Sequence, residues 1–163
     1  MREILFRGKR VSNGEWVEGY YTELPVGSLA ATIFSNDKEI VCEDTTSYII
    51  KVFAKQHSNY PHSNPLQVIE CEKYEVIPET VGQYTGLKDK NGVKIFEGDI
   101  LEYDDGYDYF KAVIKYKTGS FGAVCCDSFV GFGEMEWYSN QNYDMAVIGN
   151  IYDNLELVEV KNG

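Results

Sequence analysis

The chain has 163 residues, 44% of them hydrophobic and 14% aromatic, and its 15 basic and 26 acidic residues give a formal net charge of −11. This length suits one ordinary domain or two very small ones, and the composition is that of a globular chain and not of a disordered one. The negative charge repels phosphate backbones, which makes nucleic acid a poor partner. No apolar run approaches the ~20 residues of a membrane span and no signal peptide is visible, so we expect a cytoplasmic protein.

The N-terminal part predicts β-strands joined by polar turns. Residues 2–8 and 15–21 flank a turn at 12–14, which together predict a β-hairpin. Residues 32–42 predict a second hairpin, and residues 48–54 form a third run rich in β-branched and aromatic side chains. We therefore expect an N-terminal β-hairpin region.

The chain between residues 57 and 82 mixes a loop, a strand and a helical turn. Residues 57–65 are rich in Ser, Asn and Pro, which predicts a loop, and residues 70–77 predict a half-buried strand. Residues 78–82 begin with Pro and end with Gly, as a single helical turn does. No other helical periodicity is visible, so we expect at most one or two short helical turns.

The densest run of turn residues spans 83–101. Asn91-Gly92 is the pair best able to adopt positive φ at successive positions, so it predicts a tight reversal. Gly98-Asp99 predicts a second bend, directly before the apolar pair Ile100-Leu101. The run contains no nucleophile–base pair and no metal-ligand spacing, so we interpret its turn residues as structural.

Short strands follow at regular spacing to the end of the chain. Five segments each predict a strand: residues 99–103, 109–117, 120–127, 134–138 and 146–152. In the second of these strands the apolar side chains alternate with polar ones. Five short strands at intervals of about 8–12 residues predict a small SH3-like barrel, which would also remove exposed strand edges.

Three segments carry a resemblance to a known family: Gln83–Gly92 with Glu97–Ile100, Phe6–Arg10 with Asn13-Gly14, and Val147–Asn154. They resemble the YopX family, whose members are small proteins encoded by phages and prophages of Gram-positive bacteria. The resemblance implies a mostly β protein with a barrel-like C-terminal half. It implies no catalytic residue, because the family has no assigned biochemical activity.

The resemblance and the turn pattern together predict two regions. The first is an N-terminal β-rich region of residues 1–82, and the second is a barrel-like region of residues 83–163 that contains the signature stretch. The chain has Asn154-Leu155 where Asn-Pro is expected in the family. The signature turn residues are Gly86, Asn91, Gly92, Gly98, Asp99, Gly149 and Asn150.

Two clusters could bind a cation, and both have a simpler interpretation. Asp104, Asp105 and Asp108 could coordinate calcium, but their spacing does not match an EF-hand loop, and a solvated hairpin tip explains them better. His57 and His62 offer two imidazoles, whereas a zinc site needs three or four ligands. We therefore expect no cofactor and no metal.

The cysteines and the known motifs point to no enzyme activity. In a cytosolic chain we expect Cys42, Cys71, Cys125 and Cys126 to be reduced and packed in the core. Gly131-Phe132-Gly133 lacks the Lys and the helix of a phosphate loop, and no Gly-x-Ser-x-Gly elbow occurs. The sequence therefore predicts a protein that is not an enzyme.

Aromatic and basic residues leave one alternative open. The aromatic side chains of Tyr103, Tyr107, Tyr109, Phe110 and Tyr116 could stack bases, although cross-strand packing explains them better. The basic residues are Arg7, Lys9, Arg10, Lys88, Lys90 and Lys94, a set too small to offset the net charge. The alternative functional hypothesis is a nucleic-acid-associated β-barrel protein.

The main functional hypothesis is a non-catalytic phage or prophage accessory protein that acts through protein–protein contacts. Tyrosine is abundant, and Trp16 and Trp137 add side chains that interfaces favour. We expect a homo-oligomer or an unknown phage or host protein as partner, with the homo-oligomer slightly favoured.

Overall fold

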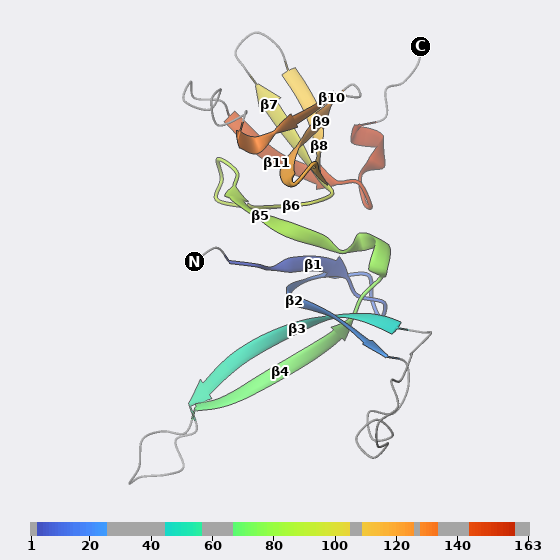
Figure 1. The fold of residues 1–163 in the computed structure, drawn as a ribbon, viewed down its shortest axis with the longest axis vertical. Helices are drawn as coiled ribbons and strands as arrows, with labels where there is room; N and C mark the ends of the chain where they lie inside the picture. The colour runs from blue at the N-terminus through green and yellow to red at the C-terminus, as the bar shows by residue number, and fades with distance from the viewer. Residues whose placement is uncertain are drawn as a thin grey trace. The chain divides into compact units, whose positions relative to one another are not determined.

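The structure is a computed structural model, and it describes residues 3–25, 45–56, 67–104, 109–125, 128–133 and 144–158. The chain divides into two compact units (Figure 1). The N-terminal unit is Leu5–Val81, and the C-terminal unit is Gly82–Gly163 together with Met1–Ile4. The described strands of both units are antiparallel, which confirms the prediction of a mostly β protein.

The N-terminal unit contains four strands in the order β4-β3-β2-β1. They are β1 (Phe6–Lys9), β2 (Trp16–Pro25), β3 (Thr45–Gln56) and β4 (Gln67–Glu75). Lys9 lies opposite Trp16 across the first turn, so the predicted N-terminal hairpin is confirmed. The predicted hairpin of residues 32–42 and the predicted loop of residues 57–65 lie outside the described residues.

The four strands of the N-terminal unit close on one another at one end. Arg10 and Val76 form an antiparallel bridge, the Val11 N–H donates to the Glu75 carbonyl at 3.0 Å, and the Ile77 N–H donates to the Lys9 carbonyl at 2.8 Å. The 3₁₀ turn η1 (Pro78–Thr80) follows, as the sequence predicts, and Thr80 Oγ1 accepts a hydrogen bond from the Lys9 N–H. The chain beyond β1 is thereby joined to the chain beyond β4.

A small core lies on the inner face of the closed end. Val17, Ile49 and Val76 are buried there. Side chains alternate along each strand, so on each strand the neighbours of these core residues in the sequence point to the opposite face. We call that opposite side of β1–β4 the outer face.

The C-terminal unit begins with a pair of strands and continues into a larger sheet. The strands β5 (Gly82–Lys88) and β6 (Lys94–Phe96) pair with each other through a register shift. The five-stranded sheet has the order β10-β9-β8-β7-β11. Its strands are β7 (Asp99–Asp104), β8 (Tyr109–Lys117), β9 (Ser120–Cys125), β10 (Ser128–Gly131) and β11 (Asp144–Asn150).

One face of the five-stranded sheet carries the core of this unit. Ile95, Leu101, Ala112, Ile114 and Ala123 are buried together. Ala112 and Ile114 occupy the inward positions that the alternation in β8 predicts. A second 3₁₀ turn, η2 (Leu155–Leu157), follows β11.

The predicted SH3-like barrel is not confirmed. In the part of the C-terminal unit that is described, β10 and β11 are the outer strands of an open sheet and do not pair with each other. Alternation shows that a strand has one buried face, but it does not show which strands meet across the sheet edges. The predicted strand at residues 134–138 and the predicted tip at 105–108 lie outside the described residues.

We predict that a fragment of residues 79–163 folds on its own. Its five-stranded sheet has its own buried core, which is the requirement for independent stability. The fragment is expected to show β-type circular dichroism and a cooperative thermal transition. A disordered fragment would contradict this expectation.

Candidate functional site

Asp89 organises the loop between β5 and β6. Its Oδ1 accepts hydrogen bonds from the Asn91 and Val93 N–H groups, both at 2.8 Å. Its Oδ2 accepts from the Val147 N–H of β11 at 3.0 Å, and the neighbouring Lys90 N–H donates to the Met145 carbonyl. One buried carboxylate therefore joins the Asn91-Gly92 turn to a strand 58 residues away.

The environment of Asp89 favours its charged form. Burial alone would raise the pKa of this carboxyl, but hydrogen bonds from the backbone N–H groups of Val147, Val93 and Asn91 outweigh that effect and hold the pKa below its ordinary value. A carboxylate that accepts several backbone N–H groups is a strong local constraint.

We predict that acid weakens the C-terminal unit through Asp89. Because the pKa is lower in the folded state than in the unfolded chain, the stabilisation is complete above the unfolded value of about 3.9 and is lost as the pH falls through the folded value. Urea unfolding between pH 7 and pH 3 measures this loss. In Asp89→Asn, which cannot ionise, the difference in stability from the wild-type protein should shrink as the pH falls, and a constant difference would contradict the prediction.

A second buried carboxylate, Asp99, follows the bend at Gly98. Its Oδ2 accepts a hydrogen bond from the Phe96 N–H at 2.8 Å, and its Oδ1 accepts from Asn150 Nδ2 at 3.2 Å. The Gly98 N–H donates to the Ile114 carbonyl, and the Gly98 carbonyl accepts from the Ile151 N–H, both at 2.9 Å. This bend thus contacts β6, β8 and the end of β11.

In the turn after β11, the side chain of Asn154 lies close to the backbone of Gly149. An added Cβ at Gly149 would meet Asn154 Oδ1 at 2.6 Å, so the position excludes larger side chains. Asn154 Oδ1 also accepts from the Asn150 N–H at 3.3 Å. The predicted turn at Asn154-Leu155 is therefore built on Asn154.

All seven predicted signature residues lie in the C-terminal unit. Gly86, Gly92 and Gly98 have φ values of 91°, 81° and 85°, which only glycine adopts without strain. Asp99 and Asn150 are in direct contact, so the structure brings the 83–101 and 147–154 segments together. Sequence reasoning did not single out Asp89, although its position in the turn run, two residues before Asn91-Gly92, was a signal for an Asx-type turn.

The predicted cation and cysteine positions are only partly described. Among the three aspartates considered for calcium, only the backbone of Asp104 is described, and His57, His62, Cys42 and Cys126 lie outside the described residues. Within the described ranges, no group of three or more His, Cys, Asp or Glu side chains could hold a metal ion. Cys125 packs against the core, but Cys71 is exposed, so its predicted core position is wrong; it lies on the outer face of β4, the last strand of its sheet.

The outer face of the N-terminal unit presents aromatic rings and cations. Tyr20 lies opposite Ile50, which lies opposite Lys73, so these three side chains share the outer face. Tyr20 is 55% exposed and Val52 is 49% exposed. We define the outer-face cluster as Arg7, Lys9, Trp16, Tyr20, Tyr48, Ile50, Val52 and Lys73; the acidic residues Glu18, opposite Arg7, and Glu75, opposite Tyr48, share this face.

Cations cover two of these rings. The Arg7 guanidinium lies 4.6 Å and the Lys9 ammonium 5.6 Å from the centre of the Trp16 ring. The Lys73 ammonium lies 4.2 Å from the centre of the Tyr48 ring. Such contacts are attractive and order both partners, so the cluster is a defined surface of rings and charges.

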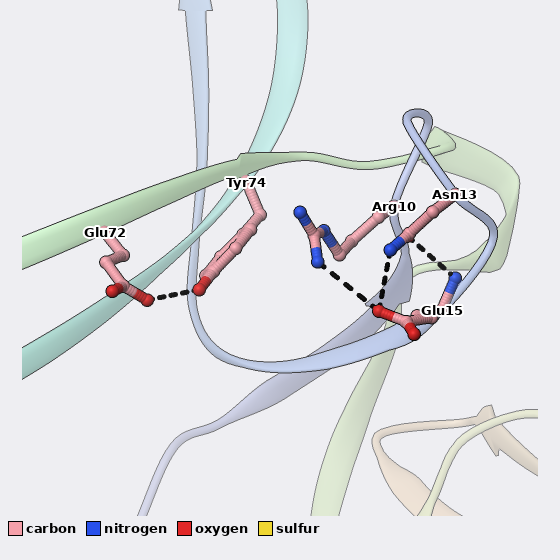
Figure 2. Close-up of polar contacts among 5 residues, drawn as sticks. All are labelled: Arg10, Asn13, Glu15, Glu72 and Tyr74. Carbon is pink, nitrogen blue, oxygen red and sulfur yellow. Dashed lines mark hydrogen bonds and ion pairs between the residues drawn. The ribbon is translucent and has the colours of Figure 1, made fainter.

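Arg10, the third basic residue of the predicted N-terminal set, is engaged elsewhere (Figure 2). Its Nη1 lies 3.5 Å from Glu15 Oε2, and its guanidinium lies 4.6 Å from the centre of the Tyr74 ring. Asn13 Nδ2 also donates to Glu15 Oε2, and the Tyr74 hydroxyl donates to Glu72. Glu15 therefore offsets the charge of Arg10, and Arg7 and Lys9 are the residues of this N-terminal set that belong to the outer-face cluster.

Sequence reasoning missed a row of lysines in the C-terminal unit. Lys111, Lys115 and Lys117 are exposed, and their spacing of four and two residues places them on the same face of β8, opposite the core. The Lys117 ammonium lies 5.9 Å from the centre of the Phe129 ring. On the core-bearing face, Tyr103 pairs with Phe110 and Tyr116 pairs with Phe121 across the strands, with ring centres 6.4 and 5.0 Å apart.

These features define an all-β protein of two antiparallel units, with a turn network in one and an aromatic–cationic surface in the other. A family model described as YopX protein matches residues 32–159, and the chain belongs to the YopX family. The Phe6–Arg10 segment lies outside the matched residues. No helix in the described ranges is long and apolar enough to cross a membrane.

The chain is also similar to a solved structure, the crystal structure of protein EF1440 from Enterococcus faecalis. The two share 26% sequence identity with a TM-score of 0.52, over 98% of this chain and 100% of the other. No curated protein matches the chain.

Proposed function

We propose that this protein is a non-catalytic accessory protein of a phage or prophage, which works inside the bacterial cell through contacts with other protein chains. The observation that supports this proposal is the outer-face cluster. Trp, Tyr and Arg are the side chains that dominate protein-binding energy, and the cluster combines all three types on one sheet face. Its partner is a second copy of the chain or another protein.

The cluster suits recognition because its rings are held in place before any partner arrives. Arg7 and Lys9 lie against Trp16, and Lys73 lies against Tyr48. A pre-ordered ring loses little conformational entropy on binding, which favours affinity. These side chains offer contact area and charge, and they include no nucleophile with an adjacent base.

The test of the proposed function compares two surface variants. Light scattering at two salt concentrations measures self-association, and quantitative pull-down from a host lysate measures other partners. Association by the wild-type protein should be lost in the double variant Trp16→Ala with Tyr20→Ala. It should persist in Tyr109→Ala, which removes an equally exposed tyrosine from the C-terminal unit. A strictly monomeric wild-type protein that enriches no partner would overturn the proposal.

A second candidate function, association with nucleic acid, is favoured by the lysine row. Lys111, Lys115 and Lys117 with Phe129 place cations beside an aromatic ring, as surfaces that bind single strands do. The net charge of −11 opposes it, because non-specific affinity comes mainly from the neutralisation of phosphates.

We predict that the full chain does not bind single-stranded DNA or RNA at micromolar concentrations. Fluorescence anisotropy at low salt is the most permissive measurement, since charge screening is weakest there. Micromolar binding that disappears in a Lys115→Ala, Lys117→Ala variant would support the second candidate over the first.

A further inference from the structure

The outward edge of β4 has a defined hydrogen-bonding polarity. The Val76 N–H donates to the Ser47 carbonyl of β3, whereas the Glu75 carbonyl points the other way and accepts from the Val11 N–H, both at 3.0 Å. In an antiparallel pair the direction of the backbone groups alternates from residue to residue. The N–H and C=O groups of Glu72 and Tyr74 therefore face β3, and those of Cys71 and Lys73 point outward.

This outward edge is long and, among the described strands, open. The strand β4 has nine residues, whereas strands commonly have about five or six. It is the last strand of its sheet, and the closure of the sheet reaches it only at Glu75. An open edge of this length is a template for an added strand.

We propose that the open edge of β4 binds an extended, basic segment of another protein as an added strand. This inference rests on the proposed function and names its partner chemistry. Backbone hydrogen bonds to Cys71 and Lys73 would supply the attachment, as in other cases of strand addition. The exposed Glu72 and Glu75 beside this edge, and the chain's charge of −11, favour lysine or arginine in the added segment.

A second copy of the chain is the less suitable occupant. In an antiparallel pair, two residues directly opposite each other either both point their backbone groups at the partner or both point them away, so a two-fold pair must be centred on a single residue. A pair centred on Glu72 would oppose two glutamates, and one centred on Lys73 would oppose two lysines. Like charges directly opposite each other are destabilising, and the net charge of each copy adds to the repulsion.

The edge is continuous with the outer-face cluster. Lys73 belongs to both, because its backbone groups line the edge while its ammonium lies over the Tyr48 ring. Cys71, directly opposite Val52, is also exposed. A segment added beside β4 would therefore extend the sheet and present its own side chains next to Cys71 and Lys73, with Tyr48 and Val52 one strand further on.

Amide hydrogen exchange on the full chain tests the proposal. In the free protein the Cys71 and Lys73 amides should exchange rapidly, and the Glu72 and Tyr74 amides slowly. A blocked eight-residue peptide of alternating threonine and lysine should slow the two outward amides by at least about tenfold at low salt, and less at high salt. The matched threonine–glutamate peptide should not protect them. Slow exchange in the free protein, or no protection by the lysine peptide, would overturn the proposal.

Two substitutions of Lys73 separate the contribution of its backbone N–H from the contribution of its side-chain charge. Lys73→Pro removes an outward N–H without removing a bond to β3, so it should abolish protection of Cys71 by the peptide. Lys73→Ala keeps the N–H and should still bind. If Lys73→Pro does not fold, as judged by circular dichroism, the exchange result on the wild-type protein decides alone. If Lys73→Pro folds and still binds the peptide, the edge is not the site. The proposed function itself fails only if the wild-type protein neither self-associates nor captures a partner.

Discussion

Replacing Gly98 by valine is expected to lower the free energy of unfolding by about 3 kcal/mol, because a β-branched side chain would be forced to a positive φ. Gly98 has a φ of +85°, and an added Cβ would lie 3.4 Å from both Asn150 Nδ2 and the Tyr152 ring. The backbone of Gly98 is hydrogen-bonded to Ile114 and to Ile151. Thermal and urea unfolding measure the loss.

Two other glycines provide matched controls. Gly92 has a similar φ of +81° but meets no atom within 4 Å of an added Cβ, so Gly92→Val should lose only the backbone contribution, about 1–2 kcal/mol. Gly133 has an ordinary φ and equally open space, so Gly133→Val should be nearly neutral. Equal stability of the Gly98 and Gly133 variants would show that the bend tolerates a side chain.

Truncating Asp89 is expected to have a similar effect through lost hydrogen bonds. Asp89→Ala leaves the N–H groups of Asn91, Val93 and Val147 without their acceptor, which should cost about 2–4 kcal/mol. Asp89→Asn keeps one carbonyl oxygen for the two N–H groups of the turn and loses only the acceptor for Val147. It should therefore cost about half as much.

The relative stability losses of Asp89→Ala and Asp89→Asn test the role of Asp89. Amide exchange at Val147 should accelerate in both, whereas exchange at Asn91 and Val93 should accelerate only in Asp89→Ala. If both variants were as stable as the wild-type protein, the carboxylate would not be the link between the turn and β11. If stability held while partner capture fell, this stretch would be a binding site instead.

Local patterns predicted much of the secondary structure. The N-terminal hairpin, the strand at residues 70–77 and the turn at Pro78 are all confirmed, because each depends on neighbours in the sequence. The barrel was not confirmed, because closure depends on which distant strands pair. An end-to-end closure occurs instead in the N-terminal unit, through Arg10 and Val76, where the sequence carries no turn signal for it.

The candidate surfaces were less visible in the sequence than the turns. Arg7, Lys9 and Arg10 form one basic run in the sequence, yet Arg10 lies against Glu15, whereas Arg7 and Lys9 lie against Trp16. The lysine row could have been predicted from the alternation of Lys111, Lys115 and Lys117 with apolar residues. The net charge of the whole chain does not show such a local group of cations. Cys71 was assigned to the core by residue type alone, although its position on an outer strand exposes it.

By itself, the sequence determined that this protein is mostly β and where its backbone must turn, since positive φ at Gly92 and Gly98 and alternation along a strand are properties of a few adjacent residues. Only the tertiary structure decided what these elements meet. The hydrogen bonds from Val147 to Asp89 and from Asn150 to Asp99 span 58 and 51 residues. The outward direction of the Cys71 and Lys73 amides likewise follows from the pairing of Val76 with Ser47 and not from the residues themselves. Contacts of this kind depend on strand register, and register is set by the burial of whole sheet faces, which no short stretch of sequence contains.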